Sequence, residues 1–229
     1  MIKNKKLIIA IIIISIIIIS VIIFLINNKK YNYTHLLENR DYDIVYTKTN
    51  TNIDNVPYIN INNDSINKIN QEIESIYQNY LIFSPNGFKY NYSVSGNILS
   101  VIITAQVVHP ESTHYDIIYK SYNIDLANLK VLTNKEILDK YNISEDKMKY
   151  YLYNKFLNYY NDLILNKYFT EKECDFNSFL ESKNIDFMLD DFNFYINNKH
   201  LELYMYFNIF TKYKEENYFN EDSFHFIIT

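Results

Sequence analysis

Two histidines five residues apart, His109 and His114, are the side chains best placed to do chemistry, and Glu111 and Asp116 lie beside them in the stretch VVHPESTHYDII. Imidazole nitrogens and carboxylate oxygens bind zinc and act as general acids or bases. A zinc site needs about three or four converging ligands, whereas this loop supplies two histidines and the others lie far away in the sequence. We therefore interpret the four residues as ligand-contacting loop residues without a metal. A metal-dependent envelope hydrolase that uses His109 and His114 is the alternative.

The other residue types that carry chemistry in enzymes form no catalytic pattern. Cys174 stands in EKECDF, where acidic neighbours disfavour the thiolate that a nucleophile needs. No serine lies in a Gly-x-Ser-x-Gly motif, and no glycine-rich loop is present to cradle a phosphate. We therefore predict that the protein is not an enzyme and has no catalytic residues, no metal and no cofactor.

Tyrosine is the second kind of residue that suggests recognition, and the chain has 24 of them. Aromatic faces stack on sugars, but core positions and an AT-rich codon bias explain most of these tyrosines. Tyr204 and Tyr206 differ, because alternation places them opposite the inward face of their strand. Tyrosine contributes contact area at low entropic cost, so we predict that both line an interface.

The elements that must position these residues follow from the hydrophobic period. Helical spacing predicts helices over 64–81 and 144–168, and period-two alternation predicts strands over 88–94, 99–107, 116–126 and 222–229. A hairpin over 192–207 is expected to turn at Asn197 and Asn198. The sum is an α+β fold, an antiparallel sheet with two main helices packed on one face.

The N-terminal region predicts a membrane anchor. Residues 7–26, LIIAIIIISIIIISVIIFLI, carry no charge and are apolar all round. At about 1.5 Å rise per residue this length spans a hydrocarbon core of about 30 Å. More lysines precede the segment than follow it, which favours a cytoplasmic N-terminus. We therefore expect a short cytoplasmic N-terminus over 1–6, a single transmembrane helix over 7–26 in the lipid bilayer, a stalk over 27–55 and an extracytoplasmic α+β domain over 56–229.

The charge of the outer region limits its partners. Removing the five lysines that flank the apolar segment from the 22 basic residues leaves 17 against 27 acidic residues, a net charge of −10. Such a charge excludes nucleic acid as the main partner and suits a basic protein. A single cysteine excludes an intramolecular disulfide, so the domain depends on its core.

A family resemblance rests on the stretch SVIITAQVVHPESTHYDIIYKSYNIDLANLKVLTNKEIL, residues 100–138. It resembles the core of an extracytoplasmic domain-of-unknown-function family found in lysozyme-sensing anti-sigma-V factors and beside some polysaccharide deacetylases. In that family a Gly-Gly-Ala-His loop precedes a strand ending in Ser-x-Asn-x-Asp-Leu, then a Leu-Thr segment enters a helix. SYNIDL, KVLTNKEIL and His114, seven residues before Ser121, follow this order, while PEST replaces the glycines.

The resemblance extends over about Val56 to Thr229 and implies lysozyme as a candidate ligand. MIKNKK is too short for a sigma-binding segment, so we do not expect anti-sigma activity. We predict a single-pass cell-membrane protein whose outer domain is a binding or sensing module of the bacterial cell envelope. Its partner is expected to be a basic protein such as lysozyme, or a cell-wall ligand.

Overall fold

The computed structural model describes ten stretches of the chain, residues 12–21, 31–48, 56–79, 87–108, 115–168, 170–172, 174–182, 192–198, 200–213 and 216–228. The strands are β1 (Val45–Thr47), β2 (Pro57–Ile59), β3 (Phe88–Ser95), β4 (Ile98–Val108), β5 (Tyr115–Asp125), β6 (Lys130–Val131), β7 (Asn193–Asn197), β8 (His200–Tyr213) and β9 (Glu216–Ile227). The helices are η1 (Thr34–Leu36), α2 (Asp64–Asn79), α3 (Asn134–Lys140), α4 (Glu145–Leu165) and α5 (Phe176–Ser182).

The first half of the region after residue 30 is an antiparallel meander covered by α2. Strands β3, β4, β5 and β6 form one sheet in chain order, and β1 pairs with β2 in a small separate sheet. Alternate residues of β4 face one hydrophobic cluster with α2, and Leu99, Val101 and Ile103 are at most 1% exposed. Gly96, with a φ of 59°, makes the tight turn between β3 and β4. This arrangement confirms the strands predicted over 88–94, 99–107 and 116–126.

The second half combines the β7–β8–β9 sheet with α3, α4 and α5 around a second cluster. Helix α4 begins after Ser144, whose side chain accepts from the Lys147 N–H, and buries Met148, Leu152, Phe156, Tyr160 and Leu163. The spacing of these residues is three or four, as expected for one helical face. Against them lie Leu201 and Leu203 of β8, both fully buried.

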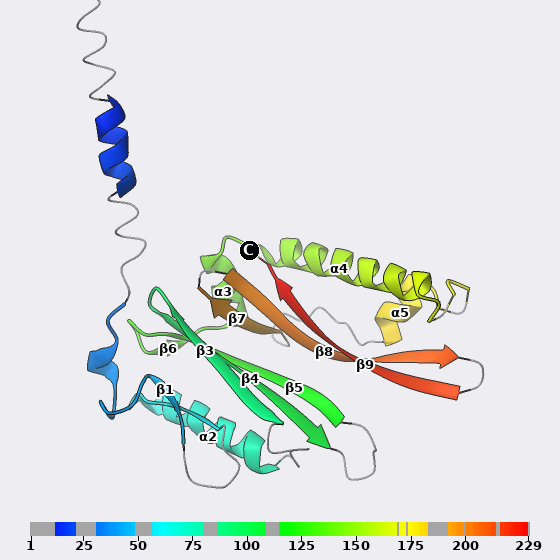
Figure 1. The fold of residues 1–229 in the computed structure, drawn as a ribbon, viewed down its shortest axis with the longest axis horizontal. Helices are drawn as coiled ribbons and strands as arrows, with labels where there is room; N and C mark the ends of the chain where they lie inside the picture. Colours follow the sequence, from blue (N-terminus) through cyan, green and yellow to red (C-terminus); the bar gives the residue numbers. More distant parts are fainter. Residues whose placement is uncertain are drawn as a thin grey trace, which may run out of the picture.

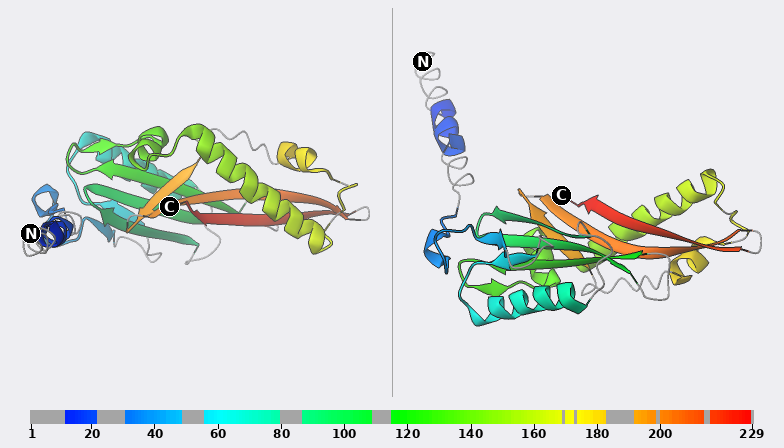
Figure 2. Two further views of the ribbon diagram at one scale, coloured as in Figure 1. Left: turned by 90° about the horizontal axis from the view of Figure 1, so that it is seen from above. Right: turned by 60° about the horizontal axis from the view of Figure 1, so that its bottom comes forward.

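The two sheets meet through polar side chains that bond to the backbone of β7. Figure 2 shows β7 crossing the strands of the first sheet. The Ser100 hydroxyl donates to Asn123 Oδ1 at 2.6 Å and accepts from the Ile196 N–H at 3.0 Å, while Asn123 Nδ2 donates to the Phe194 carbonyl at 2.8 Å. Buried polar groups are costly without partners, so these bonds fix where β7 lies on the sheet.

The observed fold confirms the α+β class with antiparallel sheets and differs from the expected arrangement of layers. We expected one sheet with both main helices on one face, but the described strands form three sheets, and α2 and α4 belong to different clusters on opposite sides of them (Figure 1). The reason is that β4 and β5 bury both faces. Ile102, on the face of β4 that points away from α2, is 2% exposed. Ser100 and Asn123 are also buried on this second face, but because they are polar the sequence pattern predicts that the face is exposed.

The N-terminal helix is described over residues 12–21, which are exposed. Within the described stretches no helix has the length and apolar character to cross a membrane. The other positions of the predicted span 7–26 lie outside those stretches.

Candidate functional site

The predicted ligand-binding residues are only partly placed by the structure. His109, Glu111 and His114 lie outside the described residues. The backbones of Asp116 and Tyr206 belong to β5 and β8, where they pair with Val107 and Ser223. Tyr204 has a described side chain, and it belongs to a cluster of polar and aromatic groups.

This Glu202 cluster lies where three strands of the second sheet approach β5. It comprises Glu202 and Tyr204 of β8, Tyr195 and Asn197 of β7, His225 of β9 and Tyr119 of β5. Strand register explains the meeting, because Glu202 pairs with Tyr195 and Tyr204 pairs with His225. Directly opposite residues on neighbouring strands bring their side chains close together.

The carboxylate of Glu202 is the buried centre of the cluster. The residue is 5% exposed, yet its charge is matched by three donors. Asn197 Nδ2 donates to Oε1 at 3.0 Å, the Tyr204 hydroxyl donates to Oε2 at 3.0 Å, and His225 Nε2 lies 2.7 Å from Oε2. Charge-assisted hydrogen bonds of this kind offset the cost of removing a carboxylate from water.

His225 connects this buried carboxylate to solvent. Its side chain is 47% exposed, and its ring stacks on Tyr204 with the centroids 4.4 Å apart. Because a carboxylate accepts only, the bond to Glu202 assigns Nε2 as the donor nitrogen. In the neutral ring Nδ1 is then a hydrogen-bond acceptor held in a fixed orientation.

Tyr204 is enclosed by aromatic rings and by the negative charge of Glu202. The rings of Tyr119 and Tyr195 lie 5.4 Å and 6.3 Å from its ring, centroid to centroid. Burial, and then the charge of Glu202, raise the pKa of Tyr204 above its ordinary value. The hydroxyl therefore stays a hydrogen-bond donor to Glu202 throughout the physiological pH range.

The cluster is suited to recognition. An oriented imidazole acceptor beside two partly exposed tyrosine rings can bind a ligand that carries hydrogen-bond donors and an apolar face. Among the described residues no group of three or more His, Cys, Asp or Glu side chains is arranged to hold a metal ion. Glu202 positions His225 and is itself too buried to contact a large ligand.

The sequence predicted Tyr204 as an interface residue but did not predict that Glu202 and His225 lie beside it. The available signal was the alternation of β8 and β9: once the hairpin register is known, residues 202 and 204 share a face and 225 lies opposite 204. The sequence does not state that register. Without the register, the sequence gives no sign that Glu202 differs from the many glutamates that are exposed to solvent.

A second carboxylate with tyrosine partners, that of Asp43, precedes strand β1. Asp43 accepts from the Tyr33 hydroxyl at 3.0 Å, the Tyr92 hydroxyl at 2.8 Å and the Ile44 N–H at 2.7 Å. Burial alone would raise the pKa of Asp43, but the hydrogen bonds from Tyr92, Ile44 and Tyr33 outweigh it and lower that pKa. These bonds tie the segment before β1 to strand β3, which is a structural role.

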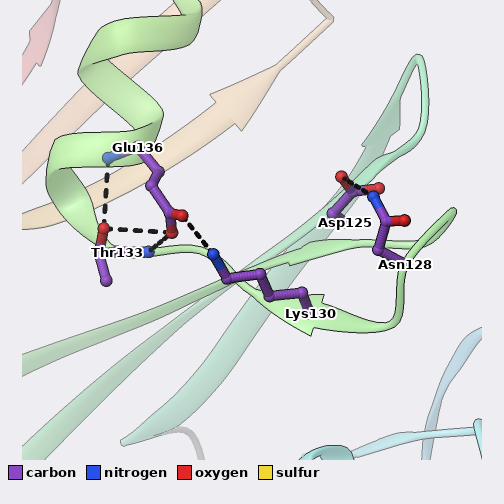
Figure 3. Close-up of polar contacts among 5 residues, drawn as sticks. All are labelled: Asp125, Asn128, Lys130, Thr133 and Glu136. Atoms are coloured by element: carbon purple, nitrogen blue, oxygen red, sulfur yellow. Dashed lines mark hydrogen bonds and ion pairs between the residues drawn. The ribbon is translucent and has the colours of Figure 1, made fainter.

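The motif that carries the family resemblance also has a structural role. Asp125 accepts from the Ala127 N–H at 3.0 Å and from Asn128 Nδ2 at 3.1 Å, which stabilises the turn after β5 (Figure 3). Thr133 and Glu136 form a reciprocal capping box at the start of α3, and Lys130 donates to Glu136 (Figure 3). SYNIDL and KVLTNKEIL are thus turn and cap signals.

No family model matches this chain, and no curated protein matches it. The family resemblance therefore stays a prediction.

Proposed function

We propose that this protein is a membrane-anchored extracytoplasmic binding or sensing module of the bacterial cell envelope. Its partner is a protein such as lysozyme, or a cell-wall ligand. The observation that carries the proposal is the stacked pair of Tyr204 and His225 above the buried carboxylate of Glu202. The apolar segment 7–26 supports the membrane anchor, and the motifs of residues 100–138 support the envelope role.

The geometry favours binding because the cluster is rigid and partly exposed. Four strands hold its members, and each of the three donors to Glu202 fixes one side chain. A rigid aromatic surface loses little side-chain entropy when a partner docks, which raises affinity without new contacts. Tyrosine and histidine also present apolar faces and polar edges together, as protein interfaces commonly require.

Charge supports a basic partner. The chain has a net charge of −5, and the region after the apolar segment is more acidic still. Opposite charges steer diffusional encounter and make the association rate fall as salt rises. A strongly basic protein such as lysozyme is attracted by this negative charge, whereas the phosphate backbone of a nucleic acid is repelled by it.

The test measures lysozyme binding to the full chain purified in detergent, at low ionic strength. We expect saturable binding that Tyr204→Ala weakens by about tenfold, because an aromatic ring that the partner covers contributes strongly to affinity. Tyr150→Ala is the matched control, since Tyr150 is 71% exposed on α4 and lies outside the cluster. Absence of binding to both lysozyme and peptidoglycan, or equal effects of the two variants, would contradict the proposal. Stoichiometric zinc that is lost in His114→Ala would instead favour the metal-dependent hydrolase.

A further inference from the structure

Strand β9 is an unusually long sheet edge. It runs from Glu216 to Ile227, 12 residues, at the end of the order β7–β8–β9. Within the described residues its one strand partner is β8, and Figure 1 shows the β8–β9 ribbon extending past the other strands. Edge strands usually carry lysine, proline or a bulge that blocks further pairing. The sequence of β9 contains no lysine, proline or glycine.

The phase of the ladder shows which backbone groups of β9 face outward. The Ile228 N–H donates to the Leu201 carbonyl at 2.7 Å, so even-numbered residues of β9 bond toward β8. Odd-numbered residues from 217 to 227 then direct their N–H and C=O groups away from β8. The Tyr151 hydroxyl of α4 donates to the Ile227 carbonyl at 3.1 Å, which agrees with this phase.

We propose that an extended, basic segment of the partner protein adds to β9 as a further strand. This inference rests on the proposed function and names how the partner is held. Main-chain hydrogen bonds to the odd-numbered residues supply affinity, as in other cases of strand addition. The strand carries Glu216, Glu221 and Asp222 and neither lysine nor arginine, so a segment with alternating basic side chains is complementary to it.

A second copy of this chain fits the edge poorly. Two β9 strands that pair antiparallel through their odd-numbered residues, about the centre of the strand, would place Glu221 of one copy opposite Glu221 of the other. Like charges directly opposite each other on neighbouring strands are destabilising. The acidic centre of β9 thus selects against self-association and for a basic partner.

The strand edge is continuous with the Glu202 cluster. His225 belongs to β9 at an odd-numbered position, so its backbone faces the incoming strand while its ring stacks on Tyr204. A partner strand would therefore bring its own side chains beside the partly exposed imidazole. Backbone pairing and aromatic contact would act on the same segment, which explains why a recognition cluster lies at the sheet edge.

Hydrogen exchange of the full chain in detergent tests strand addition directly. The probe is a synthetic decapeptide of alternating Lys and Val, with the matched Glu and Val peptide as control. We expect the basic peptide to slow exchange at residues 217, 219, 221 and 223 and the acidic peptide to have no effect. Unchanged exchange at these positions with saturating basic peptide would overturn strand addition, whatever lysozyme does.

Ser223 offers a matched pair of variants. Ser223→Pro removes an outward N–H, which an edge strand tolerates, whereas Ser223→Ala keeps it. We expect Ser223→Pro to weaken basic-peptide binding by about tenfold and Ser223→Ala to leave it unchanged. Equal affinities of the two variants would overturn the inference. If Ser223→Pro fails to fold, the exchange experiment on the unmodified chain decides.

A dimer in sedimentation that Ser223→Pro abolishes would assign the edge to a second copy and also overturn the inference. Lysozyme binding that persists in Ser223→Pro would keep the proposed function while removing strand addition.

Discussion

Asp43 and Glu202 are two carboxylates with similar donors and different surroundings. Both accept hydrogen bonds from tyrosine hydroxyls, but Asp43 is exposed and Glu202 is 5% exposed. The donors to Asp43 come from separate parts of the chain and tie them together, whereas the donors to Glu202 come from one sheet and include the exposed His225. Burial therefore decides how much each carboxylate stabilises the fold, and the exposure of its partners decides whether it can influence a ligand.

The largest expected difference is the effect of removing each carboxylate on stability. Glu202→Ala removes the buried acceptor that three side chains share and leaves a cavity in its place, so we expect the free energy of unfolding to fall by about 3 kcal/mol. Asp43→Ala is expected to cost about 1 kcal/mol or less, because water replaces the lost acceptor. Urea unfolding of the full chain in detergent measures both. Equal losses would show that burial does not separate the two sites.

Tyr204 and Tyr92, which donate to Glu202 and Asp43, allow the stability of the two sites to be compared at high pH. The pKa values of Tyr204 and Tyr92 are both raised, first by burial and then by their carboxylate partners. The folded chain then holds these protons more tightly than the unfolded chain, so their contribution is present below a pH of about 10 and is lost as pH rises further.

Tyr204→Phe should lower the free energy of unfolding by about 1 kcal/mol at neutral pH and make its decline above a pH of about 10 shallower. Tyr92→Phe is the matched change at the other carboxylate. Urea unfolding across this pH range provides the measurement. An unchanged alkaline slope in both variants would count against tyrosine ionisation as its cause.

The dependence of stability on pH in the acid range tests the role of Asp43. Its lowered pKa means that its stabilising contribution is present above the unfolded value, near a pH of about 4, and is lost as pH falls through the folded value. Asp43→Asn should therefore be less stable than the unmodified chain at neutral pH, by about 1 kcal/mol or less, and the difference should vanish in acid. Thermal unfolding between neutral and acid pH measures the difference, and a constant gap would refute the assignment.

The smallest expected effect on stability is that of His225→Ala. Because the side chain is 47% exposed, its removal should change the free energy of unfolding by about 0.5 kcal/mol while weakening lysozyme binding. Binding and urea unfolding are measured on the same preparation, with Tyr150→Ala as the control. A stability loss as large as that of Glu202→Ala would make His225 a structural residue.

Local patterns predicted α2, α4, β3, β4 and β5 closely, whereas the last strand, expected over 222–229, spans Glu216–Ile227. The inward faces of β4 and β8 and the hairpin turn at Asn198, with a φ of 50°, follow from alternation and turn chemistry. In α4 the helical period is as predicted, and the buried face includes Tyr160, at 4% exposure, instead of its neighbour Tyr159, which is only partly buried. A shift of one position on a helix is decided by the neighbouring α5, whose Phe176 and Phe179 pack on Tyr160.

The candidate site was less predictable. Tyr204 was recognised because it alternates with buried residues, yet its partners Glu202 and His225 are 23 positions apart along the chain. The buried side-chain amide of Asn70 in α2 is a second example of a contact that local patterns do not predict. Its Nδ2 donates to the Ile59 carbonyl at 3.0 Å and its Oδ1 accepts from the Ile59 N–H at 2.8 Å, as the backbone of a neighbouring strand would. Such contacts depend on packing between distant segments, which periodicity does not encode.

Composition and local period were enough to define the apolar segment 7–26, the acidic charge of the region that follows, the helices α2 and α4 and the strands β3, β4 and β5, because each depends on residues close together in the chain. Tertiary structure alone decided that β4 and β5 bury both faces and that β7 crosses them. It also decided that a buried carboxylate lies beneath the Tyr204–His225 stack. These outcomes depend on strand register and on the satisfaction of buried polar groups between segments far apart in the chain.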